Sequence, residues 1–134
     1  MIAARILSFV LALAVASVLA RAPSAIAQEQ GAFLSVIEDI PLMPGLVEDE
    51  TSAVVFDAAG GRLAETLASG SPGRAAIIAF YAETLPALGW HADGETRWVR
   101  EGEALTLEFE DAAVGKKAAG DIAVRFSLSP AKSR

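Results

Sequence analysis

Two segments near the C-terminus alternate between apolar and polar residues, and this pattern constrains the fold more than any other feature of the chain. The first is EALTLEFED, residues 103–111, and the second is IAVRFSLS, residues 122–129. A period of two is typical of antiparallel strands with one buried and one solvated face. The sequence therefore predicts an antiparallel sheet whose apolar face needs a cover. The predicted buried positions are Leu105, Leu107, Phe109, Ile122, Val124, Phe126 and Leu128.

The cover is predicted to be a helix that runs from about Pro72 to the mid-80s. Ser71 followed by Pro72 is a typical start, with serine as the N-cap and proline at the first helical position. Four apolar residues then recur at spacings of three and four, which marks one buried face. They are Ile78, Tyr81, Leu85 and Leu88.

The stretch FYAETLPALGW, residues 80–90, combines aromatic residues with signals that end a helix. Pro86 has no backbone donor, so it kinks or ends the helix. Gly89 suits the left-handed conformation that follows a helix, and Trp90 is then predicted to fold back towards the helix end. Two interpretations stay open for Tyr81, Trp90 and Trp98: they pack the core, or they form a ligand site.

The segment SAVVFD, residues 52–57, is short and rich in β-formers and predicts a strand. A second strand is predicted over 62–69, although the spacing of Leu63 and Leu67 also fits a helical turn. A further strand begins at Trp98, so the order is ββαβββ. This predicts an α+β domain over residues 51–130. Residues 28–50 are expected to be an extended, proline-containing lead-in, poorly ordered over 28–36, and residues 131–134 a flexible tail.

The N-terminus has the composition of a secretory signal peptide. Arg5 precedes a 15-residue apolar run, residues 6–20, and Ala25-Ile26-Ala27 offers the small residues that signal peptidase accepts. A membrane-spanning helix needs about 20 apolar residues, so cleavage after Ala27 is favoured over a retained anchor. The expected location is the bacterial periplasm or the exterior.

The chain is acidic and has no cysteine. Its 11 Lys and Arg and 17 Asp and Glu residues give a net charge of −6; loss of Arg5 and Arg21 with the signal leaves 9 basic residues and −8. This balance repels phosphate backbones and anionic lipids, which argues against nucleic-acid binding. The absence of cysteine excludes disulfides and thiol nucleophiles.

Residues suited to catalysis or metal binding are few. His91 is the single histidine, and no G-x-S-x-G motif accompanies it. One histidine without cysteine does not make a zinc site. The acidic runs 48–50 and 110–111 lack the spacing of a calcium loop, and calcium binding by them stays open. We therefore predict no catalytic residue, metal ligand or cofactor.

Several strings of the chain resemble a group of small exported proteins of alphaproteobacteria. They are FYxxTLPxLGW, DIPLMPGL, VVFDAAGGR, VREGEALTLEF and VRFSLSP. The resemblance covers residues 37–130 and implies a single exported domain. No activity is attached to the group, so the resemblance implies no site residues.

The segment IPLMPGL, residues 40–46, is the sequence's best candidate for a binding surface. Its apolar residues either cover the domain or dock into a partner, by strand addition or in an apolar groove. They are Ile40, Leu42, Met43 and Leu46. The sequence thus favours a noncatalytic domain that binds another envelope protein. The alternatives are a small hydrolase with converging carboxylates and a small-ligand carrier with a cavity beneath Trp90 and Trp98; the oligomeric state stays open.

Overall fold

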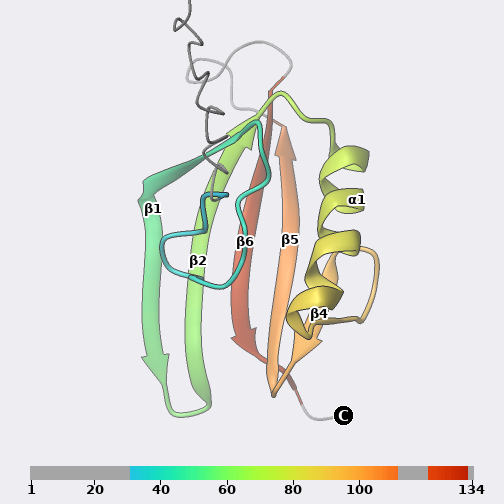
Figure 1. Cartoon of the computed structure of the whole chain (residues 1–134). Coiled ribbons are helices and arrows are strands. Elements are labelled where there is room, and N and C mark those ends of the chain that lie inside the picture. Colours follow the sequence, from blue (N-terminus) through green and yellow to red (C-terminus); the bar gives the residue numbers. More distant parts are fainter. Residues whose placement is uncertain (1–30, 112–120, 133–134) are drawn as a thin grey trace, which may run out of the picture.

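The computed structural model describes residues 31–111 and 121–132. The predicted signal peptide, residues 1–27, and nearly all of the connector predicted over 112–121 lie outside these ranges. Within them, six strands form one antiparallel sheet in the order β1-β2-β6-β5-β4-β3 (Figure 1). The elements are β1 (Leu46–Ala58), β2 (Gly61–Gly70), α1 (Arg74–Thr84), the 3₁₀ turn η1 (Leu85–Leu88), β3 (His91–Ala92), β4 (Arg97–Arg100), β5 (Glu103–Asp111) and β6 (Ile122–Pro130).

The predicted α+β class is confirmed, with one helix on one face of an antiparallel sheet. The alternating segments form β5 and β6, which pair so that Leu107 lies opposite Phe126. Residues 62–69, predicted as a strand with a helical turn as the alternative, belong to strand β2. The sequence predicted one strand fewer because β3 is only two residues long, too short to show a period.

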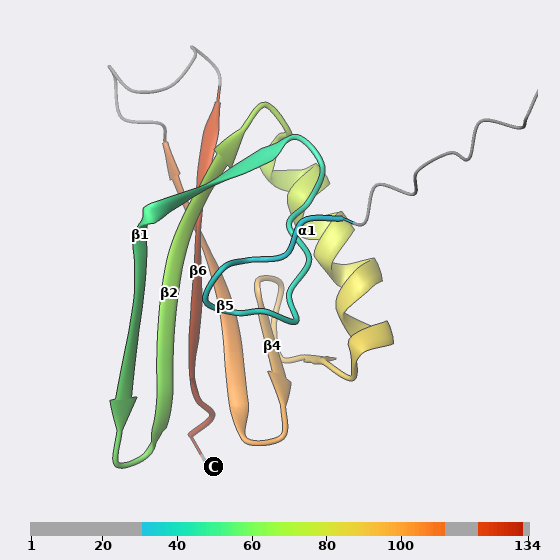
Figure 2. The same cartoon turned by 60° about the vertical axis from the view of Figure 1, so that its left-hand side comes forward.

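Two elements share the cover of the sheet. Helix α1 lies over β4 and β5, and the segment 31–45, which we call the N-terminal arm, lies over β2 and β6 (Figures 1 and 2). Tyr81 of α1 meets Phe126 of β6 edge to face, with ring centroids 5.4 Å apart. The arm contributes three fully buried side chains to the same core: Leu34, Ile37 and Ile40.

For residues 31–50, the arm corrects the prediction of an extended lead-in before a domain that starts at 51. Its backbone folds back on itself, since the Leu34 N–H donates to the Ile40 carbonyl at 3.0 Å. The physical reason is the size of the sheet: a helix of 11 residues covers one half, and the apolar residues of the arm cover the other. At the other end, the Ala131 N–H donates to the Gly102 carbonyl at 2.7 Å, so the first residue of the predicted flexible tail is held against the loop between β4 and β5.

The helix starts later than predicted. Its N-cap is Gly73, without a side-chain cap, and Ser71 and Pro72 belong to the connection. Strand β2 stays paired with β1 up to Gly70, which lies opposite Leu46. The residues directly before the connection therefore belong to the sheet, and the helix begins after it. The buried face also differs: Ile77, Tyr81 and Leu85 are buried, whereas Ile78 is half-buried and Leu88 is exposed.

The predicted helix end is confirmed. Gly89 has a left-handed φ of 86°, and its N–H donates to the Pro86 carbonyl at 3.1 Å. The Trp90 N–H donates to the Leu85 carbonyl at 3.1 Å. These two bonds form a Schellman motif, which returns Trp90 to the core.

Candidate interaction surface

Strand β1 lies at the edge of the sheet and is divided by a kink. Its register with β2 breaks between Asp49 and Val54, so that residues 50–53 stand opposite Thr66 alone. At this break the hydroxyl of Ser52 accepts the N–H of Leu67 at 2.9 Å. The bend is visible in both views of the fold (Figures 1 and 2). It separates an acidic first part, residues 48–50, from a second part, residues 53–58, which we call the edge segment.

The register fixes which backbone groups of the edge segment are free to pair. A two-residue loop joins β1 to β2, and Ala58 lies opposite Gly61. A hairpin of this kind closes on a hydrogen-bonded pair, and such pairs alternate along antiparallel strands. Residues 54, 56 and 58 therefore direct their N–H and C=O groups to β2. Val55 and Asp57 direct theirs to the open edge.

The edge segment is apolar on both faces and exposed. The exposed fractions are 41% for Val54, 43% for Val55 and 62% for Phe56. Leu63 on β2 pairs with Phe56 and is 39% exposed. We call Val54, Phe56 and Leu63 the outer strip, because they lie on the face of the sheet opposite the helix. The strip borders a hollow of about 200 Å³ that continues to Ser127 and Ser129 of β6.

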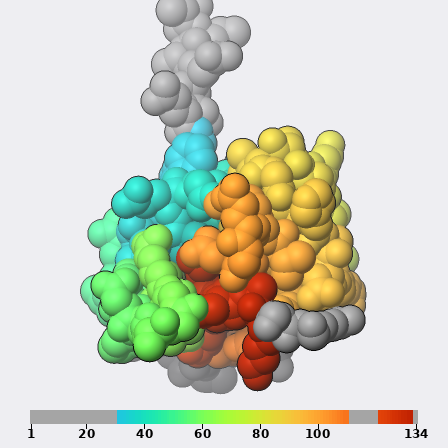
Figure 3. Space-filling view, turned by 90° about the horizontal axis from the view of Figure 1, so that it is seen from below, coloured from blue at the N-terminus to red at the C-terminus, as the bar shows by residue number. Residues whose placement is uncertain are grey.

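The two parts of β1 differ in how they are protected against unwanted pairing. Natural edge strands are protected by charges, prolines and bulges. The first part of β1 has three consecutive acids and ends in the kink. The edge segment has no charge before Asp57 and no proline. From below, the β1–β2 hairpin, in green, forms one flank of the molecule (Figure 3). An unprotected apolar edge of this kind is typical of a binding surface.

Next to the hollow, charges on the outer face are paired across three strands. Arg125 of β6 contacts Glu65 of β2, and its Nη2 lies 2.6 Å from Oε1 of Glu110 on β5. Hydrogen bonds to Glu110 and Glu65 raise the pKa of Arg125. Glu110, a member of the acidic run 110–111, is thus engaged by an arginine.

The arm residues predicted to bind a partner are part of the core or packed on it. Ile40 and Leu46 are buried, and Leu42 and Met43 are half-buried against the core cluster. The arm is also tied to the helix, because the Tyr81 hydroxyl donates to the Pro41 carbonyl at 2.9 Å and accepts the Met43 N–H at 3.2 Å. This placement favours the covering interpretation of the segment 40–46.

The three aromatic residues proposed as a ligand site also lie in the core. Tyr81, Trp90 and Trp98 are each at most 1% exposed. The guanidinium of Arg100 lies 4.4 Å from the centre of the Trp90 ring and covers it. Neither tryptophan lines the hollow beside the outer strip or the polar hollow described next. Their placement favours core packing over a carrier cavity.

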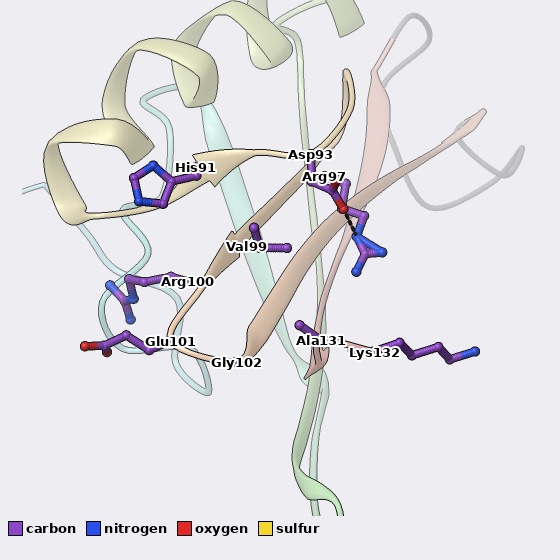
Figure 4. Close-up of a pocket in the computed structure, with 9 residues that line it drawn as sticks. All are labelled: His91, Asp93, Arg97, Val99, Arg100, Glu101, Gly102, Ala131 and Lys132. Carbon is purple, nitrogen blue, oxygen red and sulfur yellow. Dashed lines mark ion pairs between the residues drawn. The ribbon is translucent and has the colours of Figure 1, made fainter. Parts of the chain in front are cut away.

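The polar hollow has a volume of about 600 Å³ and lies at the β3–β4 end of the sheet. It contains His91, and its charged side chains diverge rather than converge (Figure 4). His91, Arg100 and Glu101 point to one side, whereas the ion pair of Arg97 with Asp93, 3.2 Å apart, lies on the other. Such an arrangement does not bring an acid and a base onto one substrate atom.

The acidic run 48–50 makes structural contacts. The carboxylate of Glu48 accepts the Ser35 N–H at 3.0 Å and the Thr66 hydroxyl at 2.7 Å, which links the arm to β2. Asp49 accepts the Thr51 hydroxyl at 2.5 Å. Among the described residues, no group of three or more His, Cys, Asp or Glu side chains is placed to hold a metal ion.

Comparison with protein-family models, curated proteins and solved structures gives no match for this chain. The resemblance noted from the sequence therefore stays a prediction. In the part of the chain that the structure describes, no helix is long and apolar enough to cross a membrane.

The exposed apolar surface of β1 was not predicted from the sequence. Val54, Val55 and Phe56 were predicted only as a strand. These three consecutive apolar residues are a departure from the usual pattern, because a half-buried strand alternates between apolar and polar residues. The sequence therefore contained a signal that both faces of this segment are apolar. Only the strand order, with β1 at the edge, distinguishes an exposed run of this kind from a strand buried on both faces.

Proposed function

We propose that the protein is an exported, noncatalytic domain that acts by protein binding in the bacterial envelope and accepts an extended segment of its partner along β1. The observation that carries the proposal is the edge segment, residues 53–58, which is open, apolar and uncharged before Asp57. Export rests on the composition of residues 1–27, which has the pattern of a signal peptide.

Strand addition supplies both affinity and selectivity at this edge. The outward N–H and C=O groups of Val55 and Asp57 pair with the backbone of the incoming segment. The outer strip then contacts every second side chain of that segment, because neighbouring side chains alternate between faces. The polar hollow, whose charged groups diverge, gives no comparable support to a hydrolase.

A photo-crosslinking amino acid in place of Phe56 tests the proposal in cells that express the full chain. We expect a crosslink to a protein of the envelope fraction that is lost when Val55→Pro is added. Proline at position 55 removes an N–H that faces the open edge and keeps the bonds to β2, a position where strands tolerate proline.

Val55→Thr is the matched control, because it keeps the N–H and a β-branched side chain. It should retain the crosslink. A crosslink that survives Val55→Pro in a folded protein would mean that the edge does not bind by strand addition.

A further inference from the structure

The edge segment can pair with itself. In an antiparallel pair with a two-fold axis through Val55, that residue lies opposite Val55 of the second copy. Val54 then lies opposite Phe56 of the second copy, and Asp57 opposite its Ala53. We propose that the strand accepted by β1 is β1 of a second copy of this chain. The inference rests on the proposed function, because it names the occupant of the same edge.

Backbone geometry permits this centre. Val55 directs its N–H and C=O to the open edge, so two copies exchange a pair of hydrogen bonds at the axis. An axis at Val54 or Phe56 would instead centre on a non-hydrogen-bonded pair, with Val55 opposite residue 53 or residue 57 of the second copy. The hydrogen-bonded centres are the odd-numbered residues of the edge segment, and among all centres only Val55 sets each Phe56 opposite a β-branched residue of the other copy.

Charge then favours Val55 over the other hydrogen-bonded centres, Asp57 and Ala53. An axis at Asp57 places two Asp57 carboxylates directly opposite each other. An axis at Ala53 places Asp57 opposite Asp49, again two acids. The axis at Val55 places Asp57 opposite an alanine. Directly opposed like charges destabilise a strand pair. The net charge of −6 makes two copies of the chain repel each other, so self-pairing needs an uncharged segment such as residues 53–56.

The side chains support the same register. The axis is perpendicular to the sheet, so the outer faces of both copies stay on one side. Val54 of each copy meets Phe56 of the other there, and pairs of an aromatic with a β-branched residue are among the favourable cross-strand pairs. The two outer strips join into one apolar surface, which reduces the exposure of Phe56 from its present 62%. The assembly is a closed dimer with a continuous sheet, because each copy has one such edge segment.

The absence of cysteine allows a direct test. Val55→Cys and Asp57→Cys are introduced separately into the full-length chain. Each variant is expressed in the bacterium and purified in the form in which it accumulates there. In the proposed register the two Cα atoms at position 55 lie about 5.5 Å apart, within the range of about 4.4–6.8 Å that a disulfide needs. The two Cα atoms at position 57 are four residues out of register, about 14 Å apart along the strands. We expect a covalent dimer on mild oxidation of Val55→Cys and none of Asp57→Cys.

Sedimentation equilibrium of the unmodified chain gives the second measurement. We expect a monomer–dimer equilibrium whose dissociation constant rises roughly tenfold or more with Val55→Pro, and stays near the original value with Val55→Thr. Thermal unfolding of each variant checks that it is folded. If Val55→Pro does not fold, the comparison of the two cysteine variants decides alone.

A chain that stays monomeric at all concentrations and forms no disulfide at position 55 overturns the self-pairing. Equal disulfide yields at positions 55 and 57 also overturn it, because they indicate contact without this register. If the photo-crosslinker at Phe56 still captures a different protein through β1, the proposed function stands and only the self-pairing fails. If it captures neither that protein nor a second copy, both fail.

Discussion

Tyr81 is the residue through which the helix holds the arm. Its hydroxyl bonds to the Pro41 carbonyl and the Met43 N–H, and the ring is fully buried. Tyr81→Phe keeps the ring but leaves both arm groups without this partner. We expect a loss of about 1–3 kcal/mol in the free energy of unfolding, measured by urea denaturation. A change below about 0.5 kcal/mol would mean that the hydroxyl does not secure the arm.

The same residue makes stability depend on alkaline pH. Burial raises the pKa of Tyr81 in the folded protein, against the smaller lowering effect of the Met43 N–H. The unfolded chain therefore releases the phenol proton first, and stability falls as pH rises above the ordinary tyrosine pKa of about 10, by at most roughly 1.4 kcal/mol per pH unit. The advantage of wild type over Tyr81→Phe should shrink there. Because Tyr81 is the single tyrosine, absorbance follows its ionisation directly.

Gly70 is a position where any side chain collides with backbone. A Cβ atom there would lie 1.9 Å from the carbonyl oxygen of Gly45, at the point where the arm joins β1. We expect Gly70→Ala to lower the unfolding free energy by about 3 kcal/mol or more. Gly60→Ala is the control, since nothing lies within 4 Å of its added Cβ; it should change stability by less than about 0.5 kcal/mol.

Some elements could be predicted from local sequence signals, whereas the position of others is determined by packing between segments that are distant in sequence. Strands β5 and β6 and the end of the helix follow from alternation and from the proline–glycine pair, which act within a few residues. The predicted helix start was too early, because strand β2 stays paired with β1 up to Gly70, opposite Leu46. No local sequence signal indicates that pairing. The arm was misjudged for the same reason: Leu34 and Ile37 are buried in one core cluster with residues of β2 and β6, which are distant in sequence.

The helix end can be divided experimentally into two contributions. Pro86 is exposed and stands in the first turn of η1, where no N–H bond is required. Pro86→Ala should therefore change stability by less than about 1 kcal/mol. Gly89→Ala forces a left-handed alanine and should cost about 1–2 kcal/mol. Chemical denaturation of both variants checks the order, and a larger loss at Pro86 would show that proline, rather than glycine, fixes this end.

At the scale of the whole molecule, the candidate site was less predictable than the fold. The sequence made residues 40–46 the best candidate for binding because they are apolar and contain prolines, and it left open that they cover the domain, since the same composition suits a segment that completes a core. It assigned residues 52–57 to an ordinary strand. Which of these two segments is exposed depends on the strand order. Strand β1 lies at the edge of the sheet, whereas the arm crosses β2 and β6. That information lies in contacts between distant segments rather than in either segment.

The arm as a structural cover makes a prediction for the entire domain. Leu34, Ile37 and Ile40 are at most 1% exposed, and burial of such a side chain contributes about 1.5–3 kcal/mol. Together they supply about 5–9 kcal/mol, comparable with the whole stability of a small domain. A chain that lacks residues 31–45 should therefore not fold cooperatively, as measured by circular dichroism during urea titration. Phe33→Ala, at a position that is 54% exposed, is the control and should stay folded. A deletion variant that unfolds cooperatively with near-normal stability would return the arm to the role of a separable binding segment.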